Sequence, residues 1–181
     1  MRNVNEQIPH NIRLIHGNGK ENAHKAMSEL LEKILSKENM NAAYKRVCAN
    51  KGAGGVDGVT VEELGDYIKE HWRSIREQIR QRQYKPQPVR RVEIPKQNGD
   101  VRKLGIPTVM DRVIQQGIVQ VINPMCEPLF SEWSYGFRPN RSCEMAIRQL
   151  LIYLNEGYEW IVDIDLEKFF DNVPQDRLMS L

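Results

Sequence analysis

The chain has 181 residues, of which 40% are hydrophobic and 28% are charged, and its formal net charge is +2. This composition supports a packed core and excludes wholesale disorder. The sequence has no run of roughly 18 apolar residues, no secretory signal and three scattered cysteines that favour neither a disulfide framework nor a zinc cluster. We therefore expect a soluble intracellular protein with no membrane partner.

The charges are unevenly distributed along the chain. Residues 73–112 contain eleven Lys or Arg and four acids, whereas residues 150–181 contain seven acids and two Lys or Arg. A basic block followed by an acidic block suits a polyanion-binding surface beside a cation site. Charge alone is explained more simply by two solvated faces of opposite sign.

The N-terminal part is predicted to be helical after a loosely held arm. Apolar residues at helical spacing indicate a helix from Glu21 to about Leu35, and Asn39 is the expected cap of a second, short helix. Four glycines within residues 51–58 then require a loop with unusual backbone angles. Neither a Walker motif nor a dinucleotide fingerprint matches this loop, so a turn role and contact with phosphates both stay open.

Two further elements follow the loop. Thr60 and Glu63 have the spacing of a capping box, and the apolar residues after them keep helical spacing to Ile79. Apolar and polar residues then alternate on both sides of residues 97–100, which include Asn-Gly, so a β-hairpin is predicted. Its cations could close over a phosphate chain, or simply discourage pairing at the strand edges.

The C-terminal half begins with a helix capped by Thr108 and Asp111 and limited by Pro124 and Pro128. Residues 134–141 form a predicted loop, whose aromatic and arginine side chains could stack on bases or pin the loop to the core. Ser142 is the expected cap of another helix. The apolar residues 160–165 then predict a buried strand, so the fold class is α+β.

The sharpest chemical feature is the pair of carboxylates at the end of that strand. Asp163 and Asp165 would point to the same face of a strand. Burying two carboxylates is costly unless a cation compensates, and Mg²⁺ prefers oxygen ligands. An isolated Asp-x-Asp more often caps a helix or pairs with arginines.

Several segments, taken in order, resemble the reverse transcriptases encoded by bacterial group II introns. The resemblance runs from about Leu30 to Leu181 and is carried by ANKGAGGVDG (49–58), VEIPK (92–96), VRKLGIPTVMDR (101–112), SYGFRPNRS (134–142) and VDIDLEKFFDNV (162–173). It implies a right-hand polymerase fold. Residues 1–24 would be an N-terminal arm, residues 25–141 a mostly helical fingers subdomain with the hairpin, and residues 142–181 the start of the palm, with its first strand and helices.

The resemblance also implies roles for individual residues. Asp165, five residues before the aromatic Phe170, matches the family's metal-binding catalytic aspartate, with the Leu166 carbonyl as a further ligand of Mg²⁺. Phe170 would exclude the 2′-hydroxyl of the nucleotide sugar, and Lys96 and Arg102 would grip the triphosphate. Lys168 and Phe169 complete the implied nucleotide-binding set. The expected RNA-binding residues are Lys51, Arg80, Arg82, Arg90, Arg91, Arg112, Arg138 and Arg141.

The implied activity is RNA-directed DNA synthesis in intron retrohoming, with help in intron splicing. The implied partners are group II intron RNA, template RNA, primer DNA and dNTP, and the implied location is the bacterial cytoplasm, in association with the nucleoid or a ribonucleoprotein. The family's second carboxylate pair, in a Tyr-Ala-Asp-Asp hairpin, does not occur in this sequence. We therefore expect an N-terminal fragment that is inactive alone and prone to self-association.

Three other functions are alternatives to the polymerase. The first is a non-catalytic RNA-binding maturase module. The second is a phosphohydrolase with Asp163 as nucleophile, which is disfavoured because Glu167 stands where that chemistry wants a small hydroxyl residue. The third is a protein-interaction domain, which would have no affinity for nucleic acid.

Overall fold

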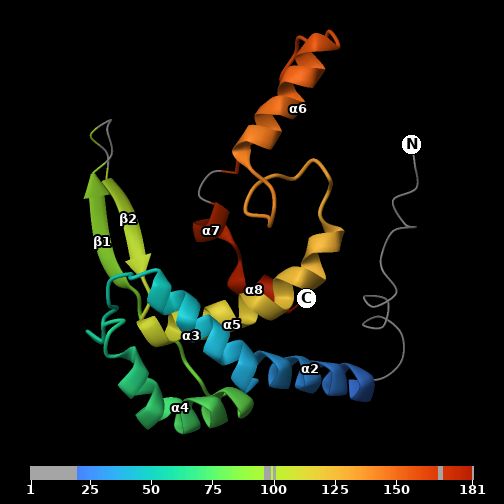
Figure 1. The fold of residues 1–181 in the computed structure, drawn as a ribbon. Coiled ribbons are helices and arrows are strands. Elements are labelled where there is room, and N and C mark those ends of the chain that lie inside the picture. The colour runs from blue at the N-terminus through green and yellow to red at the C-terminus, as the bar shows by residue number, and fades with distance from the viewer. Residues whose placement is uncertain (1–19, 96–98, 100, 167–168, 181) are drawn as a thin grey trace. The chain divides into compact units, whose positions relative to one another are not determined.

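The fold was analysed in a computed structural model, which describes residues 20–95, 99, 101–166 and 169–180. The chain divides into two compact units, Met1–Phe130 and Ser131–Leu181. Helices dominate the described residues, and a two-stranded antiparallel hairpin is added to them, which confirms a mixed α and β composition (Figure 1). None of the described helices combines the length and the apolar character needed to cross a membrane.

The first unit begins with two consecutive helices, α2 (Lys20–Ile34) and α3 (Lys37–Ala49). The break between them is set by Ser36, whose side chain accepts a hydrogen bond from the backbone N–H of Asn39 at 3.3 Å. The prediction that Asn39 caps this helix is therefore wrong, because Ser36 already occupies the cap. The Asn39 amide instead donates to the carbonyl oxygens of Ile34 at 2.8 Å and of Gly117 at 2.9 Å.

The capping box before the third helix is confirmed. The Thr60 backbone N–H donates to Glu63 Oε2 at 3.0 Å, and the Glu63 N–H donates to Thr60 Oγ1 at 3.3 Å. Regular helix α4 (Leu64–Arg80) follows directly. In the turn before α4, two backbone donors are thus satisfied by side chains three residues apart, which is why the sequence alone located this boundary.

Helix α5 (Val109–Cys126) begins at the predicted cap, because Thr108 Oγ1 accepts a hydrogen bond from the Asp111 N–H at 3.1 Å. Pro124 and Pro128 are the predicted limits of this helix; the helix continues through Pro124 but ends at Cys126, before Pro128. A proline in the last turn removes a single backbone donor, so the turn can still close. A short 3₁₀ helix, η2 (Glu127–Leu129), follows.

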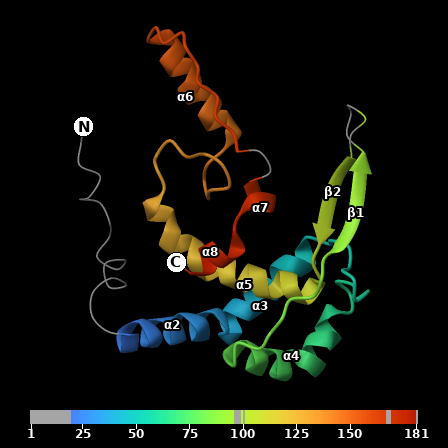
Figure 2. The same cartoon turned by 180° about the vertical axis from the view of Figure 1, so that it is seen from behind.

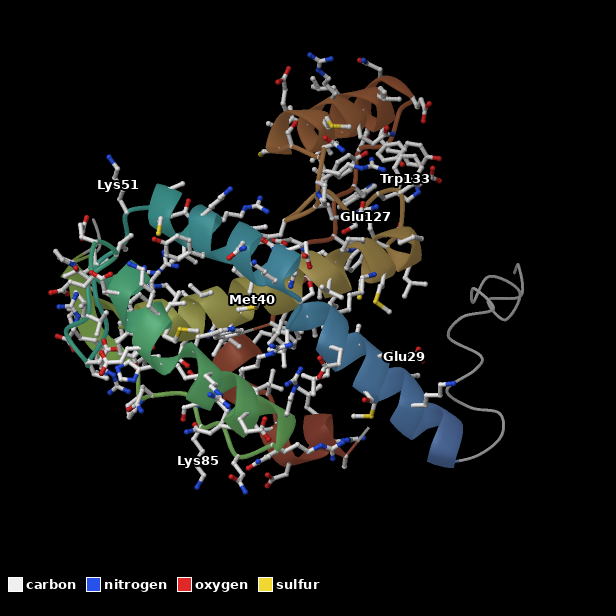
Figure 3. The ribbon with its side chains drawn as sticks, turned by 60° about the horizontal axis from the view of Figure 1, so that its bottom comes forward. Glu29, Met40, Lys51, Lys85, Glu127 and Trp133 are labelled. Atoms are coloured by element: carbon white, nitrogen blue, oxygen red, sulfur yellow. The ribbon has the colours of Figure 1, made fainter. Side chains whose placement is uncertain are left out.

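The core of the first unit lies where α3, α4 and α5 meet (Figures 1 and 2). Met40, labelled in Figure 3, lies on α3 and contacts α5 at Gly117, where an added Cβ would come within 2.9 Å of the methionine sulfur. The absence of a side chain at Gly117 therefore lets α3 and α5 approach closely. The cluster of buried residues consists of Met40, Ala43, Val47, Val61, Leu64, Ile75, Val109, Met110 and Val113.

The predicted hairpin is also confirmed. Strand β1 (Arg90–Pro95) pairs with β2 (Val101–Ile106) in an antiparallel register that places Val92 opposite Leu104 and Ile94 opposite Arg102. Gly99 in the connection has φ +87°, a backbone conformation that favours glycine. The remaining residues of the tip, including Lys96, fall outside the described residues.

The second unit contains α6 (Cys143–Asn155), α7 (Phe169–Asn172) and α8 (Gln175–Met179). Ser142 caps α6 as predicted, because its side chain accepts a hydrogen bond from the Met145 N–H at 3.3 Å. Gly157, with φ +94°, follows the end of the helix. No residue of α6 is buried, so the apolar side chains of this helix remain exposed within their own unit.

The buried strand predicted at residues 160–165 is not observed. This segment has no regular secondary structure, and Trp160, Val162 and Ile164 are 94%, 83% and 83% exposed. A strand is stabilised by hydrogen bonds to a neighbouring strand, and the only sheet among the described residues is the β1–β2 hairpin. An apolar, β-branched sequence therefore does not form a strand here without a partner.

Candidate functional site

The hairpin presents cations on both of its faces. Residues opposite each other in an antiparallel pair share a face, so Arg90 and Arg102 flank the apolar pair formed by Val92 and Leu104. Arg90, Arg102 and Leu104 on this face are all exposed. This face can offer guanidinium groups to a phosphate and apolar surface to a base or sugar.

On the opposite face of the hairpin, Arg91 lies opposite Gly105 and Glu93 lies opposite Lys103. Opposite charges at facing positions stabilise the pairing of the strands by a few tenths of a kcal/mol. Arg91 has no acidic residue opposite it, so its charge is not neutralised across the strands. The predicted RNA-binding residues Arg90 and Arg91 are thus both exposed, but on different faces.

The glycine-rich loop is held against the start of α5. Arg112 Nη2 donates to the Ala53 carbonyl at 2.7 Å, and Arg112 also lies against Gly52. A Cβ on Gly55 would come within 2.6 Å of Thr108 Cα, so only glycine permits this approach of two backbones. The loop is therefore fixed by packing, which supports the turn role that the sequence left open.

Lys51 stands at the entrance to this loop, just beyond the end of α3. Its φ of +46° is a left-handed conformation, and its backbone N–H donates to the Cys48 carbonyl at 3.2 Å. The side chain is exposed and points away from the helices (Figure 3). Lys51 is thus available at the surface, whereas Arg112 in the same neighbourhood is engaged by the loop backbone.

The two arginines at the end of α4 have different environments. Arg80 forms a bidentate ion pair with Glu32 of α2, with N–O distances of 2.8 and 2.7 Å. This pair lowers the pKa of Glu32 and raises the pKa of Arg80. Arg82, two residues later, is exposed with φ +58°. Of the two predicted RNA contacts, Arg80 is therefore already committed to linking α2 with α4.

A buried polar cluster at the start of α5 was not anticipated in full. The Asp111 carboxylate, 3% exposed, accepts hydrogen bonds from Tyr84 Oη at 2.6 Å, Thr108 Oγ1 at 2.7 Å and the Gln87 N–H at 3.1 Å. Burial and the Asp111 hydrogen bond raise the pKa of Tyr84 above its usual range. The cluster fixes the connection between α4 and β1 to α5, and thereby anchors the base of the hairpin. Only the Thr108 and Asp111 cap spacing signalled it in the sequence.

In the second unit, two predicted RNA-binding arginines hold the loop at residues 134–141. Arg138 donates to the carbonyl oxygens of Ser131 at 2.5 Å and Ser134 at 3.1 Å, and Arg141 donates to the Glu132 carbonyl at 3.1 Å. The Arg141 guanidinium also lies 5.6 Å from the centre of the Tyr135 ring. The loop is thus held by its arginines.

The aromatic residues of the same loop behave differently from each other. Tyr135 is partly buried, whereas Phe137 is fully exposed with φ +56°. The idea that Phe137 pins the loop to the core is therefore wrong, because its ring reaches solvent. An exposed aromatic ring on a loop stiffened by arginines can stack on an unpaired base.

The predicted metal ligands lie in the exposed segment after α6. Asp163, Asp165 and Leu166 are all exposed, and the described residues contain no group of three His, Cys, Asp or Glu placed to hold a metal ion. The expected burial of the two carboxylates is therefore not observed. Phe169 and Phe170 lie in α7, Phe169 being half exposed, and Lys168 lies outside the described residues, as Lys96 does.

Comparison with known proteins identifies the type of domain. Residues 94–180 match the reverse transcriptase (RNA-dependent DNA polymerase) family. The match begins near the end of β1 and includes β2, α5, the arginine-held loop and Asp165, whereas Arg90 and Arg91 precede it. The segments singled out for their chemistry are thus mostly those that define the family.

The chain is also similar to several curated proteins. It is 36% identical over 160 residues to Protein YkfC of Escherichia coli (85% of this chain, 42% of the relative). It is 33% identical over 165 residues to the group II intron-encoded protein LtrA of Lactococcus lactis (91% of this chain, 27% of the relative). It is 32% identical over 74 residues to the mitochondrial nuclear intron maturase 1 of Arabidopsis thaliana (41% of this chain, 10% of the relative).

The chain thus spans less than half the length of these relatives. The family match runs from the end of β1 to residue 180, and the relatives extend the similarity to most of the remaining chain. Together these matches place the chain in the family of reverse transcriptases and maturases encoded by group II introns.

Proposed function

We propose that the chain forms part of an RNA-directed DNA polymerase that acts in the retrohoming of a group II intron. The observation that carries this proposal is the reverse transcriptase match over residues 94–180, which contains Arg102 of the hairpin and Asp165. In this assignment residues 1–24 are an arm, residues 25–141 the fingers and residues 142–181 the beginning of the palm. The buried cluster around Asp111 supports the fingers assignment, because it fixes the hairpin to a helical base.

The proposed metal is Mg²⁺, held by the Asp165 carboxylate and the Leu166 carbonyl. Both are hard oxygen donors on an exposed segment, which fits an ion that keeps several waters and substrate phosphates. When bound, such ions supply activation of a primer 3′-hydroxyl and neutralisation of a leaving pyrophosphate. One carboxylate cannot satisfy two ions, so we propose that these 181 residues alone do not polymerise.

The remaining residues act on the substrates in this proposal. Arg102 and Lys96 hold the triphosphate, while Lys168, Phe169 and Phe170 position the nucleotide and exclude a 2′-hydroxyl. Lys51, Arg82, Arg90 and Arg91 are exposed and free to contact RNA phosphates. Arg80, Arg112, Arg138 and Arg141 are tied to protein acceptors, so their contribution to RNA binding is indirect unless those bonds exchange.

Primer extension tests the catalytic proposal. In a full-length protein that contains this chain, Asp165→Asn is expected to abolish extension of a DNA primer on an RNA template, while the matched control Asp163→Asn keeps at least a tenth of the activity. The 181-residue chain is expected to give no product with Mg²⁺ and dNTPs. Full activity of the Asp165 variant, or extension by the 181-residue chain, would refute the corresponding statement.

A second candidate is an RNA-binding maturase module without its own chemistry, favoured by the similarity to nuclear intron maturase 1. Its partner would be intron RNA, in a cytoplasmic or nucleoid-associated ribonucleoprotein. The exposed apolar side chains of α6 also favour self-association. Filter binding of the intron RNA over a salt series separates this from a protein-interaction domain, since affinity that is absent or independent of salt excludes contact with phosphates.

A further inference from the structure

A cavity of about 500 Å³ lies between α3 and α4, with α5 as its floor. Its volume is that of an ordinary ligand pocket, roughly 300–1,000 Å³. None of the residues discussed above as metal, triphosphate or RNA ligands lines it. The cavity belongs entirely to the first unit, and Met40, which faces it from α3, is seen in Figure 3.

The interior of the cavity is suited to a flat aromatic ring. Trp72 and Ile68 of α4 face Tyr44 and Met40 of α3 across it. Gly65 lets the Tyr44 hydroxyl lie close to α4 at one end of the cavity, because an added Cβ there would come within 3.1 Å of the tyrosine oxygen. Tryptophan and tyrosine rings stack on nucleic-acid bases, and this contact is worth roughly 1–3 kcal/mol per base.

The rim of the cavity is cationic. Lys37, Lys69 and Arg76 line it, and no acidic residue does. Lys69 pairs with Asp66 at 2.7 Å, but both side chains are at least 80% exposed, so this pair is weak. Lys37 occupies the first turn of α3, where the helix dipole disfavours a cation, so its position does not serve the stability of the helix.

Arg76 adds to the rim a donor that the described residues leave unsatisfied. Its Nε atom is buried and has no acceptor among the described residues, and its Nη2 lies 3.8 Å from Glu32. A buried donor without an acceptor costs about 1–3 kcal/mol. The rest of the Arg76 side chain is accessible, being 38% exposed, so its guanidinium can donate to an anionic oxygen at the rim.

We propose that this groove binds an unpaired nucleotide of an RNA strand, with the base between Trp72 and Tyr44 and the flanking phosphates on Lys37, Lys69 and Arg76. This inference rests on the proposed RNA-binding function and adds a site to it. An apolar cavity of about 500 Å³ has room for a single, unstacked base and not for a duplex. Exposed Arg73, one turn along α4 from Lys69, extends the path for the strand.

The test uses Trp72 as a reporter. The chain has three tryptophans, so the variant Trp133→Phe, Trp160→Phe leaves Trp72 as the single one. Titration with a single-stranded RNA octamer is expected to quench its fluorescence saturably, with a slope of log K on log salt near −2 for three phosphate contacts. The affinities of the duplex octamer and of the free mononucleotide, measured by the same quenching, are expected to be at least tenfold weaker.

Substitutions then locate the site. Lys37→Glu is expected to weaken octamer binding about fivefold to tenfold and to flatten the salt slope, whereas the matched control Lys45→Glu, exposed on the same helix but outside the cavity, changes it less than twofold. In the tryptophan-containing chain, Trp72→Leu is expected to weaken binding about tenfold while keeping the core apolar.

Each contrary outcome has a distinct meaning. Retention of the octamer on filters without quenching of Trp72, or equal effects of the two lysine variants, overturns the groove site and leaves the proposed RNA binding intact. If the duplex or the mononucleotide quenches Trp72 as strongly as the single-stranded octamer does, the groove site is also overturned. Quenching by an acidic peptide of alternating Glu and Leu, but not by RNA, would make the groove a protein-binding site. Absence of any RNA binding overturns both proposals.

Discussion

Helices α5 and α6 begin in the same way but differ in how far their side chains are buried. Each is started by a hydroxyl side chain, Thr108 or Ser142, that accepts a hydrogen bond from a backbone N–H three residues later. Six residues of α5 are buried, whereas none of α6 is. The comparison teaches that caps and periodicity are enough to define a helix, but that burial depends on the neighbours that the fold supplies.

The β1–β2 hairpin and residues 160–165 give the same lesson for extended chain. Both have apolar or β-branched sequences. The hairpin forms because its second strand follows after five residues, so the entropy cost of pairing is small. Residues 160–165 have no such partner among the described residues and stay exposed. Four substitutions test this contrast between the packed first unit and the open second unit.

The largest expected effect comes from removing a buried leucine of the first unit. Leu64, on α4, is fully buried, so Leu64→Ala is expected to lower the free energy of unfolding by about 3 kcal/mol. The matched variant Leu150→Ala, on α6 and 43% exposed, should cost less than about 1 kcal/mol. Urea unfolding followed by circular dichroism compares them. Equal losses would show that α6 is packed as tightly as α4.

The next effect concerns the buried Asp111 carboxylate. Asp111→Asn replaces one acceptor oxygen with an amide donor that must face a hydroxyl or an N–H, so about 2 kcal/mol of stability is expected to be lost. The exposed control Asp66→Asn should cost under about 1 kcal/mol. Hydrogen exchange should also show faster opening of the hairpin base. If the amides at the hairpin base of the Asp111→Asn variant exchange at the wild-type rate, Asp111 does not anchor the hairpin.

A smaller effect depends on pH. The pKa of Tyr84 is raised in the folded protein, so the native state holds this proton more tightly than the unfolded chain, whose tyrosine pKa is about 10. The stabilisation that Tyr84 contributes is therefore fully present below pH 10 and is lost as the pH rises above 10. Tyr84→Phe should cost about 1.5 kcal/mol at pH 7 and make the decline above pH 10 shallower. The pKa values of Tyr44 and Tyr67 are also raised, so the stability of the Tyr84→Phe variant should still decline somewhat above pH 10. An unchanged pH profile would exclude Tyr84 as its cause.

The smallest effect tests the capping of the open helix. Ser142→Ala removes the acceptor for the Met145 N–H and should destabilise α6 by about 1 kcal/mol, whereas Ser142→Asp should restore it. Because α6 has no buried residue, this loss should appear as faster amide exchange within residues 143–155 without a change in the unfolding of the first unit. A shift of both units together would show that they unfold as one.

Much of the candidate site could be predicted from the sequence, but the residues with which its arginines pair could not. The hairpin, the capping boxes and the loop at residues 134–141 are local features with their own composition, and the structure has them where expected. The partners of Arg80 and Arg112 lie 48 and 59 residues away, and no local pattern encodes such a pairing. The metal and nucleotide roles of Asp165, Lys96 and Phe170 remain predictions.

The sequence by itself determined where helices and turns begin, because a cap or a glycine acts on backbone groups within a few residues. It also determined the family, through motifs that stay in order along the chain. Only the tertiary structure decided which apolar faces are buried, which arginines are held by carbonyl oxygens, and where α3 and α4 enclose a cavity. These features depend on segments far apart in the chain, whose meeting is settled by packing rather than by local preference.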